Sequence, residues 1–431
     1  MEIKLRMSTR FAWLLGVVVL VSIGLLVACG TTYNSSSDGL VLVGSQGSAA
    51  IQTFSFNLGT GHMSSVYNST SSTIASTCIL PGLPASIVLD PAGAFAYTII
   101  NAAEACNTTT TTTINGIMAF KVNSDGTMSQ IGLTPDPNPV ALFMDSAGKF
   151  LFVAEGLGGT VESFAIGGGA GLTAVPGAFT LPAAIQPPNF SALAATPTVF
   201  PGIGLNGVKN SVCAGTAVNP PTTEFLYVTD AVNNVVLEFG VDPSTGALGN
   251  PDGFTSIQVS PVGAVPSGVA VDPCDRFVYV ANNQSNTVSA FTICNGLSTQ
   301  NQKVCPIVAN GQLVPLSNSP FSLSGGGANL PGPLAVDPYG NTLYVVGTGS
   351  STISIFSISP VSGSLTPGKT STVTTGLRPT SIAIRSDDSW LFVTDFLAGT
   401  VSQYSITPAT GELSPQPPVT TDNYPWGVAV K

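Results

Sequence analysis

Ionisable side chains are scarce in this sequence. Only 8% of its 431 residues are charged, with 12 lysines and arginines, 22 aspartates and glutamates and a single histidine. A chain with so few cations cannot neutralise many phosphates, which argues against a nucleic acid as its partner. The metalloprotease, serine-hydrolase, nucleotide-binding and EF-hand motifs are missing as well. The sequence therefore contains none of the common motifs from which a function could be inferred directly.

Turn-forming and apolar residues are abundant instead. The chain contains 47 glycines and 33 prolines, and 44% of its residues are apolar. That apolar fraction is ample for a core, so the chain is not of the disordered class. Such a composition is typical of an exported all-β protein with many turns, whose surface is covered largely by Ser, Thr and Asn.

The one long uncharged run, residues 11–28, follows three positive residues at the N-terminus. It is nearly as long as a membrane span, so an uncleaved anchor or an ordinary signal peptide is an alternative interpretation. Small residues before Cys29, in the sequence LVACG at 26–30, instead resemble a bacterial lipobox. We therefore expect residues 1–28 to be a lipoprotein signal peptide and Cys29 to carry lipid. Gly30 favours the outer membrane within the cell envelope, with the protein facing the periplasm or the cell surface.

Residues 29–39 are rich in Thr, Asn and Ser and predict a flexible tether to a folded body at 40–431. Without the signal peptide the chain keeps 9 of its 12 lysines and arginines and 21 of its 22 aspartates and glutamates, a net charge of −12.

Six cysteines follow Cys29, and an even number outside the cytoplasm indicates disulfides. No two of them have the close spacing of a zinc site, so a metal site is the weaker interpretation. Six cysteines allow 15 pairings, of which spacing within one repeat favours two. The expected pairs are Cys78 with Cys106, Cys294 with Cys305 and, by elimination, Cys213 with Cys274.

The segment Pro266–Ile293 is one copy of a repeat that fills the body of the chain. Its short strands are separated by Pro, Asn and Asp turns, which predicts an antiparallel meander. Seven copies share a large apolar residue in the second strand: Leu42, Tyr97, Phe152, Tyr227, Tyr279, Tyr344 and Phe392. They share a β-branched residue in the third strand: Ile51, Ile117, Val161, Val236, Val288, Ile353 and Val401. An aromatic residue follows three positions later: Phe54, Phe120, Phe164, Phe239, Phe291, Phe356 and Tyr404.

Residues three apart on a strand point to opposite faces of a sheet. The last two sets therefore predict sheets that are buried on both faces. We predict an all-β fold, a seven-bladed β-propeller of four-stranded antiparallel blades; an open sandwich or a solenoid is the alternative. The final segment, Pro425–Lys431, repeats the first strand that the first copy lacks. We expect it to join the N-terminal blade and close the ring.

Two further features of the copies bear on the prediction. Aspartates after the first strand, such as Asp90 and Asp272, begin type I turn sequences and are expected to cap turns rather than to catalyse. The fourth copy has an insertion at about 182–210, and its first strand is expected at Val212–Val218.

The stretches that best match one another are FVYVANNQSNTVSAF (277–291), LYVTDAVNNVVLEF (226–239) and LFVTDFLAGTVSQY (391–404). They resemble the YVTN-type repeat of seven-bladed propellers. Over roughly 40–431 the chain is similar to the lactonase family, which includes 6-phosphogluconolactonase-like propellers. The resemblance implies a site at the channel mouth that hydrolyses or forms a lactone with His, Arg and Glu residues. The mature chain offers few of these: His62 and the arginines Arg276, Arg378 and Arg385.

In a meander, the turns after the second strands share one face with the loops that lead into the first strands. We expect ligands at that face, because binding residues usually lie on loops held by a rigid scaffold. The alternative is that these short polar turns are merely solvated. The catalytic candidates are Glu155, Asp230 and Arg378, and the ligand-binding candidates are Glu104, Asn138, Asn282, Asn283, Asp395 and Tyr424.

Two functions remain open. The first is a binding or scaffold module for a glycan, peptide or protein partner, which the shortage of His and Arg favours. The second is a lactonase-type hydrolase of a sugar lactone, in which Glu155 or Asp230 activates water and Arg378 holds an anionic substrate. No cofactor is expected, although carboxylates and carbonyls at the mouth suit Ca²⁺. A closed ring needs no second subunit, so we expect a monomer.

Overall fold

The computed structural model describes residues 38–68, 83–101, 115–156, 159–177, 179–180, 189–195, 224–250, 258–294, 305, 311–323 and 329–431. No helix in this part of the chain has the length and hydropathy to cross a membrane. Five residues with predicted roles lie outside the described residues: Cys29, Cys78, Glu104, Cys106 and Cys213.

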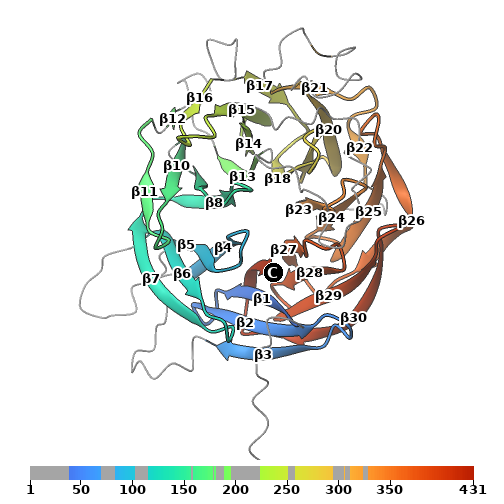
Figure 1. The fold of residues 1–431 in the computed structure, drawn as a ribbon. Coiled ribbons are helices and arrows are strands. Elements are labelled where there is room, and N and C mark those ends of the chain that lie inside the picture. Colours follow the sequence, from blue (N-terminus) through green and yellow to red (C-terminus); the bar gives the residue numbers. More distant parts are fainter. Residues whose placement is uncertain are drawn as a thin grey trace, which may run out of the picture.

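The described strands form seven antiparallel sheets arranged around a central axis (Figure 1). The predicted seven-bladed propeller is therefore confirmed. We number the blades 1–7 along the chain and name the strands of each blade from the axis outwards. The innermost strands of blades 1–7 are β31 (Pro425–Val430), β4 (Leu83–Leu89), β8 (Pro139–Met144), β13 (Phe190–Ala195), β18 (Pro266–Val271), β23 (Pro331–Val336) and β27 (Pro379–Ile384).

The second strands are β1 (Asp38–Ser45), β5 (Phe95–Asn101), β9 (Phe150–Glu155), β14 (Glu224–Asp230), β19 (Phe277–Asn282), β24 (Thr342–Gly347) and β28 (Trp390–Asp395). The third strands are β2 (Ala50–Asn57), β6 (Gly116–Val122), β10 (Thr160–Ile166), β15 (Val235–Val241), β20 (Thr287–Cys294), β25 (Thr352–Ile358) and β29 (Thr400–Thr407). The outer strands are β3 (Met63–Asn68), β7 (Met128–Pro135), β11 (Leu172–Ala174), β16 (Leu248–Gly249), β21 (Gln312–Pro315), β26 (Leu365–Thr374) and β30 (Glu412–Thr420). Three short strands, β12 (Phe179–Thr180), β17 (Gln258–Pro261) and β22 (Phe321–Ser322), pair with the third strands of blades 3, 4 and 5.

The two ends of the chain close the ring within blade 1, as predicted. The C-terminal strand β31 pairs with β1, and Val428 lies opposite Val43. We call the interface between two neighbouring blades a seam. The seam between blades 1 and 7 is apolar: the Phe56 ring packs edge-on against Phe392, with 5.1 Å between ring centroids. Closure thus gives blade 1 the innermost strand that its N-terminal part lacks.

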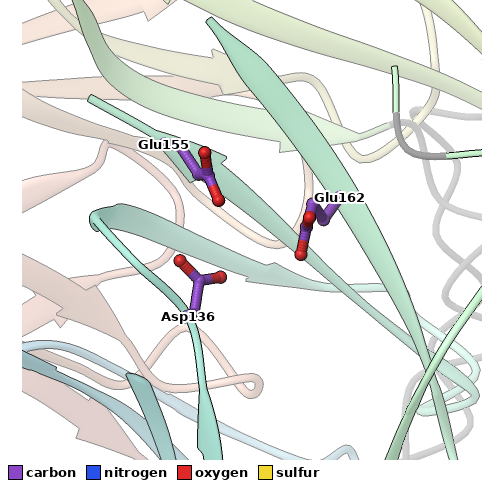
Figure 2. Close-up of side chains that lie close together, drawn as sticks. All are labelled: Asp136, Glu155 and Glu162. Atoms are coloured by element: carbon purple, nitrogen blue, oxygen red, sulfur yellow. The ribbon is translucent and has the colours of Figure 1, made fainter. Parts of the chain in front are cut away.

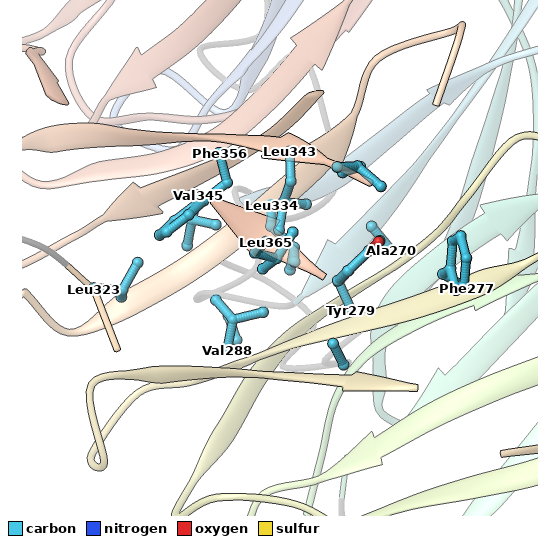
Figure 3. Close-up of a cluster of buried hydrophobic side chains, with 13 residues drawn as sticks. Ala270, Phe277, Tyr279, Val288, Leu323, Leu334, Leu343, Val345, Phe356 and Leu365 are labelled. Carbon is cyan, nitrogen blue, oxygen red and sulfur yellow. The ribbon is translucent and has the colours of Figure 1, made fainter. Parts of the chain in front are cut away.

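The core lies between neighbouring blades. Val288 packs on the blade 6 side of its sheet (Figure 3). Phe291 packs on the blade 4 side, which confirms that both faces are buried. The second-strand tyrosines link neighbouring blades as well. The hydroxyl of Tyr279 donates to the Gly363 carbonyl at 2.9 Å, and Tyr344 does the same to Gly411. A buried hydroxyl is thereby satisfied at each of these seams.

The turn aspartates are structural, as expected. Oδ1 of Asp90 accepts hydrogen bonds from the backbone N–H groups of Ala94 and Phe95. Asp145 accepts from Lys149 and Phe150 in the same way.

The expectation for the fourth blade was wrong. Its innermost strand is Phe190–Ala195, which pairs with β14, whereas 212–218 lies outside the described residues. This strand falls inside the stretch predicted as an insertion. It lacks the Pro at its start that marks the other copies, and it is held by the burial of Phe190 and Leu193 in the seam to blade 3.

The disulfide between Cys294 and Cys305 is present as predicted. Cys274 is also disulfide-bonded. Its expected partner, Cys213, lies outside the described residues.

Candidate functional site

The face expected to bind ligands carries the turns between second and third strands and the loops that enter the innermost strands. We call it the mouth face. The innermost strands of all seven blades surround a central cavity of about 430 Å³, a size typical of small-molecule sites. None of the described residues that line this cavity is charged. Ionic chemistry at this face must therefore come from the rim.

Three carboxylates converge on the mouth face between blades 2 and 3 (Figure 2). Asp136, Glu155 and Glu162 each place a carboxylate oxygen within 4.8 Å of the others. We call these residues the acidic cluster. Glu155 ends β9, and Glu162 lies on the neighbouring strand β10, opposite Val153. Val153 and Glu155 are two residues apart on β9 and therefore share a face. Val153 packs toward blade 2, so Glu155 and the paired Glu162 face blade 2 as well. The connection from blade 2 to blade 3 brings Asp136 to the same place.

The acidic cluster is largely buried, and no lysine or arginine of the described ranges forms an ion pair with it. Asp136 and Glu155 are only 2% and 5% exposed, while Glu162 is half-buried. Burial, with Glu155 and Glu162 nearby, raises the pKa of Asp136 to about 7. Burial and the charge of Glu162 also raise the pKa of Glu155. Oδ1 of Asp136 accepts a hydrogen bond from the N–H of Asn138, but its buried Oδ2 has no hydrogen-bond partner among the residues that the structure describes.

The predicted residues Arg378 and Tyr424 meet on the same face at blades 7 and 1. They do so through the ring of Phe396, which lies 5.0 Å from the Tyr424 ring and 5.0 Å below the Arg378 guanidinium carbon. Phe396 also packs edge-on against Trp426 at 5.3 Å, and Trp426 lines the central cavity. We call these four residues the aromatic platform. Arg378 and Tyr424 are exposed, and Arg378 forms no ion pair with any described residue.

The remaining candidates hold turns and seams. Asp230 accepts hydrogen bonds from the N–H groups of Asn189, Val232 and Asn233, and also from the Asn233 side chain. The Asn283 amide donates to the Pro331 carbonyl of blade 6 at 3.0 Å. Neither side chain is therefore presented freely to a ligand.

Asn138, Asn282 and Asp395 also have local partners. The carbonyl of Asn138 accepts from the N–H of Gly156, beside the acidic cluster. The amide of Asn282 donates to Thr287 and Ser289. Asp395 accepts from two hydroxyls of its own blade.

Sequence reasoning missed two of the three residues of the acidic cluster and two of the four residues of the aromatic platform. Asp136 and Glu162 were not singled out as cluster members, and neither Phe396 nor Trp426 was expected on the platform. A signal was present in the repeat itself. Phe396 stands directly after the second strand, where blades 1, 3, 4 and 5 have Gln46, Gly156, Ala231 and Asn283.

The other family-type residues lie away from this site. Arg276 forms a bidentate ion pair with Asp272 and donates to the Gly340 carbonyl of blade 6, so it joins two blades at the opposite face. His62 is exposed in an outer turn of blade 1. The acidic cluster and the aromatic platform are therefore the two groups of candidate functional residues on the mouth face.

Comparisons with known proteins agree with this architecture. The structure of a candidate 6-phosphogluconolactonase from Bacteroides fragilis superposes with a TM-score of 0.65 at 18% identity, covering 93% of this chain and 99% of that one. The periplasmic gluconolactonase of Pseudomonas aeruginosa gives a TM-score of 0.66 at 17% identity, covering 91% and 99%. At such identities the likeness is one of fold. No curated protein sequence matches.

The family model described as "Lactonase, 7-bladed beta-propeller" matches residues 199–314 and 303–424. Together these two matches span more than half of the chain, and they include most of blades 4–7. The chain therefore belongs to the lactonase family of seven-bladed β-propellers.

Proposed function

We propose that this protein hydrolyses a sugar lactone at the mouth face. The observation that carries the proposal is the aromatic platform at the rim of an uncharged cavity. Its rings offer apolar faces to a ring-shaped ligand. The free guanidinium of Arg378 offers charge-assisted hydrogen bonds to an anionic or oxygen-rich substituent. Membership of the lactonase family supports the same substrate class.

The reaction needs one water molecule. Its oxygen adds to the lactone carbonyl, the ring C–O bond breaks, and the ring oxygen takes up a proton, which gives an open-chain hydroxy acid. The carboxylates of the acidic cluster are the basic groups that this face provides for activating such a water. Asp230, the other carboxylate expected to do so, is fully engaged in its turn.

The test is turnover of a panel of sugar lactones, with and without a phosphate group, measured as acid release above the spontaneous rate. We expect Arg378→Ala and Tyr424→Ala to lower kcat/KM about tenfold or more, because each removes a contact to the bound ring. The matched control is Lys369→Ala, which removes an exposed cation from the outer strand of blade 6. Its kcat/KM should equal that of the wild type.

The binding or scaffold function remains the second candidate. It is favoured by the exposure of the platform and its surroundings, where Tyr424 is 48%, Leu397 55% and Leu377 62% exposed. A pure binding module would leave every lactone unhydrolysed yet still bind a glycan or peptide, with affinity lost in Tyr424→Ala. Absence of both turnover and ligand binding would overturn both functions.

We also propose that the protein is a lipid-anchored resident of the cell envelope. The LVACG sequence at 26–30 supports this location, and the Cys294–Cys305 disulfide is compatible with it. Mass spectrometry of the mature N-terminus should find a lipidated Cys29. An unmodified chain that begins at Met1 would contradict the anchor.

A further inference from the structure

The acidic cluster occupies a position that recurs around the ring. In blades 5 and 7 the second strand also ends in a buried polar residue, Asn282 or Asp395. The residue three before the innermost strand of the same blade is there a glycine, Gly263 or Gly376. A Cβ at Gly376 would lie 2.6 Å from the Asp395 carboxyl carbon, and one at Gly263 would lie 2.7 Å from the Asn282 amide carbon. These seams have no room for a further side chain.

Hydroxyl groups complete the arrangement in both of those blades. Thr400 and Ser402 donate to Oδ2 of Asp395 at 2.9 and 2.7 Å. The Asn282 amide donates to Thr287 and Ser289 at 3.0 Å each. Each of these seams therefore holds at most one carboxylate, next to neutral hydrogen-bonding groups.

Blade 3 replaces all three groups with acids. Glu155 stands where Asp395 and Asn282 stand, Asp136 stands where the glycines stand, and Glu162 stands where Ser289 and Ser402 stand. No lysine or arginine among the described residues pairs with any of the three. Asp136 is 2% exposed, yet within the described part of the chain its Oδ2 has no hydrogen-bond partner. A buried acceptor of this kind costs free energy unless something positive or protic meets it.

We propose that Asp136, Glu155 and Glu162 bind one divalent cation, with Ca²⁺ as the best-matched ion. All the offered ligands are carboxylate oxygens, which hard cations prefer over softer metals such as zinc. The half-exposed side of Glu162 leaves room for water to complete the six to eight ligands that Ca²⁺ takes. Mg²⁺ is the less suitable ion because it demands near-ideal octahedral geometry and gives up water reluctantly.

The test is calorimetric titration of the purified chain, stripped with EDTA, with CaCl₂, MgCl₂ and MnCl₂ in turn. We expect one Ca²⁺ per chain and a melting temperature that rises with Ca²⁺, since an ion that binds only the folded state stabilises it. Glu162→Gln should weaken Ca²⁺ binding at least tenfold. This half-exposed residue can change without leaving a cavity, so loss of folding will not obscure the result.

The direction in which Glu162→Gln shifts the melting temperature distinguishes a residue that binds the cation from one that only supports the fold. In EDTA, Glu162→Gln should melt at a higher temperature than the wild type, because it removes a like charge. In saturating Ca²⁺ the order should reverse. The matched control is Asp422→Asn, at the blade 1 position equivalent to Asp136, where the neutral Gln52 stands in the place of Glu162 and accepts the Asp422 backbone N–H. It should bind Ca²⁺ as the wild type does.

Two results would overturn the cation site: no ion bound per chain at millimolar concentration, or equal binding by wild type and Glu162→Gln. The inference does not depend on lactone hydrolysis, because it is measured without substrate. Ion binding without turnover would contradict only the proposed function, and turnover without ion binding would contradict only the cation.

Discussion

Blades 3 and 7 use the same positions of one repeat in opposite ways. In blade 7 the buried seam has the same kinds of group as in blade 5, with Gly376 packed against Asp395, and the unusual residues are the exposed Arg378 and the partly buried Phe396. In blade 3 the position directly after the second strand is the buried Gly156, and the unusual residues are the acids of the buried seam. The residues particular to blade 3 change the charge that is buried between blades, whereas those particular to blade 7 change the surface that is offered to a ligand. The two blades together therefore give the mouth face its two groups.

The largest effect on stability should come from giving blade 7 the additional buried acid that blade 3 has. Gly376→Asp would place a second carboxylate against Asp395, where even a Cβ lies 2.6 Å from the carboxyl carbon. We expect the free energy of unfolding to fall by about 3–5 kcal/mol, as for an uncompensated buried charge. Chemical denaturation would measure this change. The control is Gly132→Ala on β7, where an added Cβ meets nothing within 4 Å. A wild-type stability for Gly376→Asp would show that the seams do not differ in available space.

The reverse exchange should have a smaller effect of opposite sign. The triple variant Asp136→Gly, Glu155→Asp, Glu162→Ser gives blade 3 the groups of blade 7. In EDTA we expect it to be about 1–2 kcal/mol more stable than the wild type, since replacing buried charges with neutral partners is often stabilising. It should also lose stabilisation by Ca²⁺. Thermal unfolding with and without Ca²⁺ measures both changes, and a less stable variant in EDTA would mean that the three acids already satisfy one another.

The smallest effect should come from Asp395→Asn, which gives blade 7 the residue of blade 5. Both residues lie beside two hydroxyls, so the change at pH 7 should be below about 1 kcal/mol. Burial raises the pKa of Asp395. Its contribution is thus fully present below the usual aspartate pKa and is lost as the pH rises through the folded-state pKa.

The stability of Asp395→Asn relative to wild type should accordingly increase from pH 4.5 to pH 8. Melting curves at the two pH values test the sign. A relative stability that decreases with pH would show that the hydroxyl donors, rather than burial, control this carboxyl group.

Much of the fold was predictable because the repeat depends on local sequence features: the alternation of side chains along strands and the residues that form turns. Paired columns such as Val288 and Phe291 require two buried faces, and turn sequences such as that at Asp90 define strand ends. The fourth blade was misplaced because Phe190–Ala195 lacks the proline and turn residues that mark the other copies. There, burial in the seam rather than local sequence decides the strand.

The candidate site was only half predictable. Glu155, Arg378 and Tyr424 were placed on the mouth face by counting along the repeat. Counting also put Asp136 near that face, but not its contact with Glu155 and Glu162. Phe396 and Trp426 could not be assigned as partners either, since all these contacts cross from one blade or strand to another.

The sequence by itself determined the architecture of this protein: seven copies of a meander, closed by the C-terminal strand. It did so because alternation, turns and repeat length act within one blade. Only the tertiary structure decided that three acids share one seam and that an arginine lies over aromatic rings beside the channel. Those arrangements depend on how far the chain turns between successive blades, which is set by packing across the seams rather than by any single repeat.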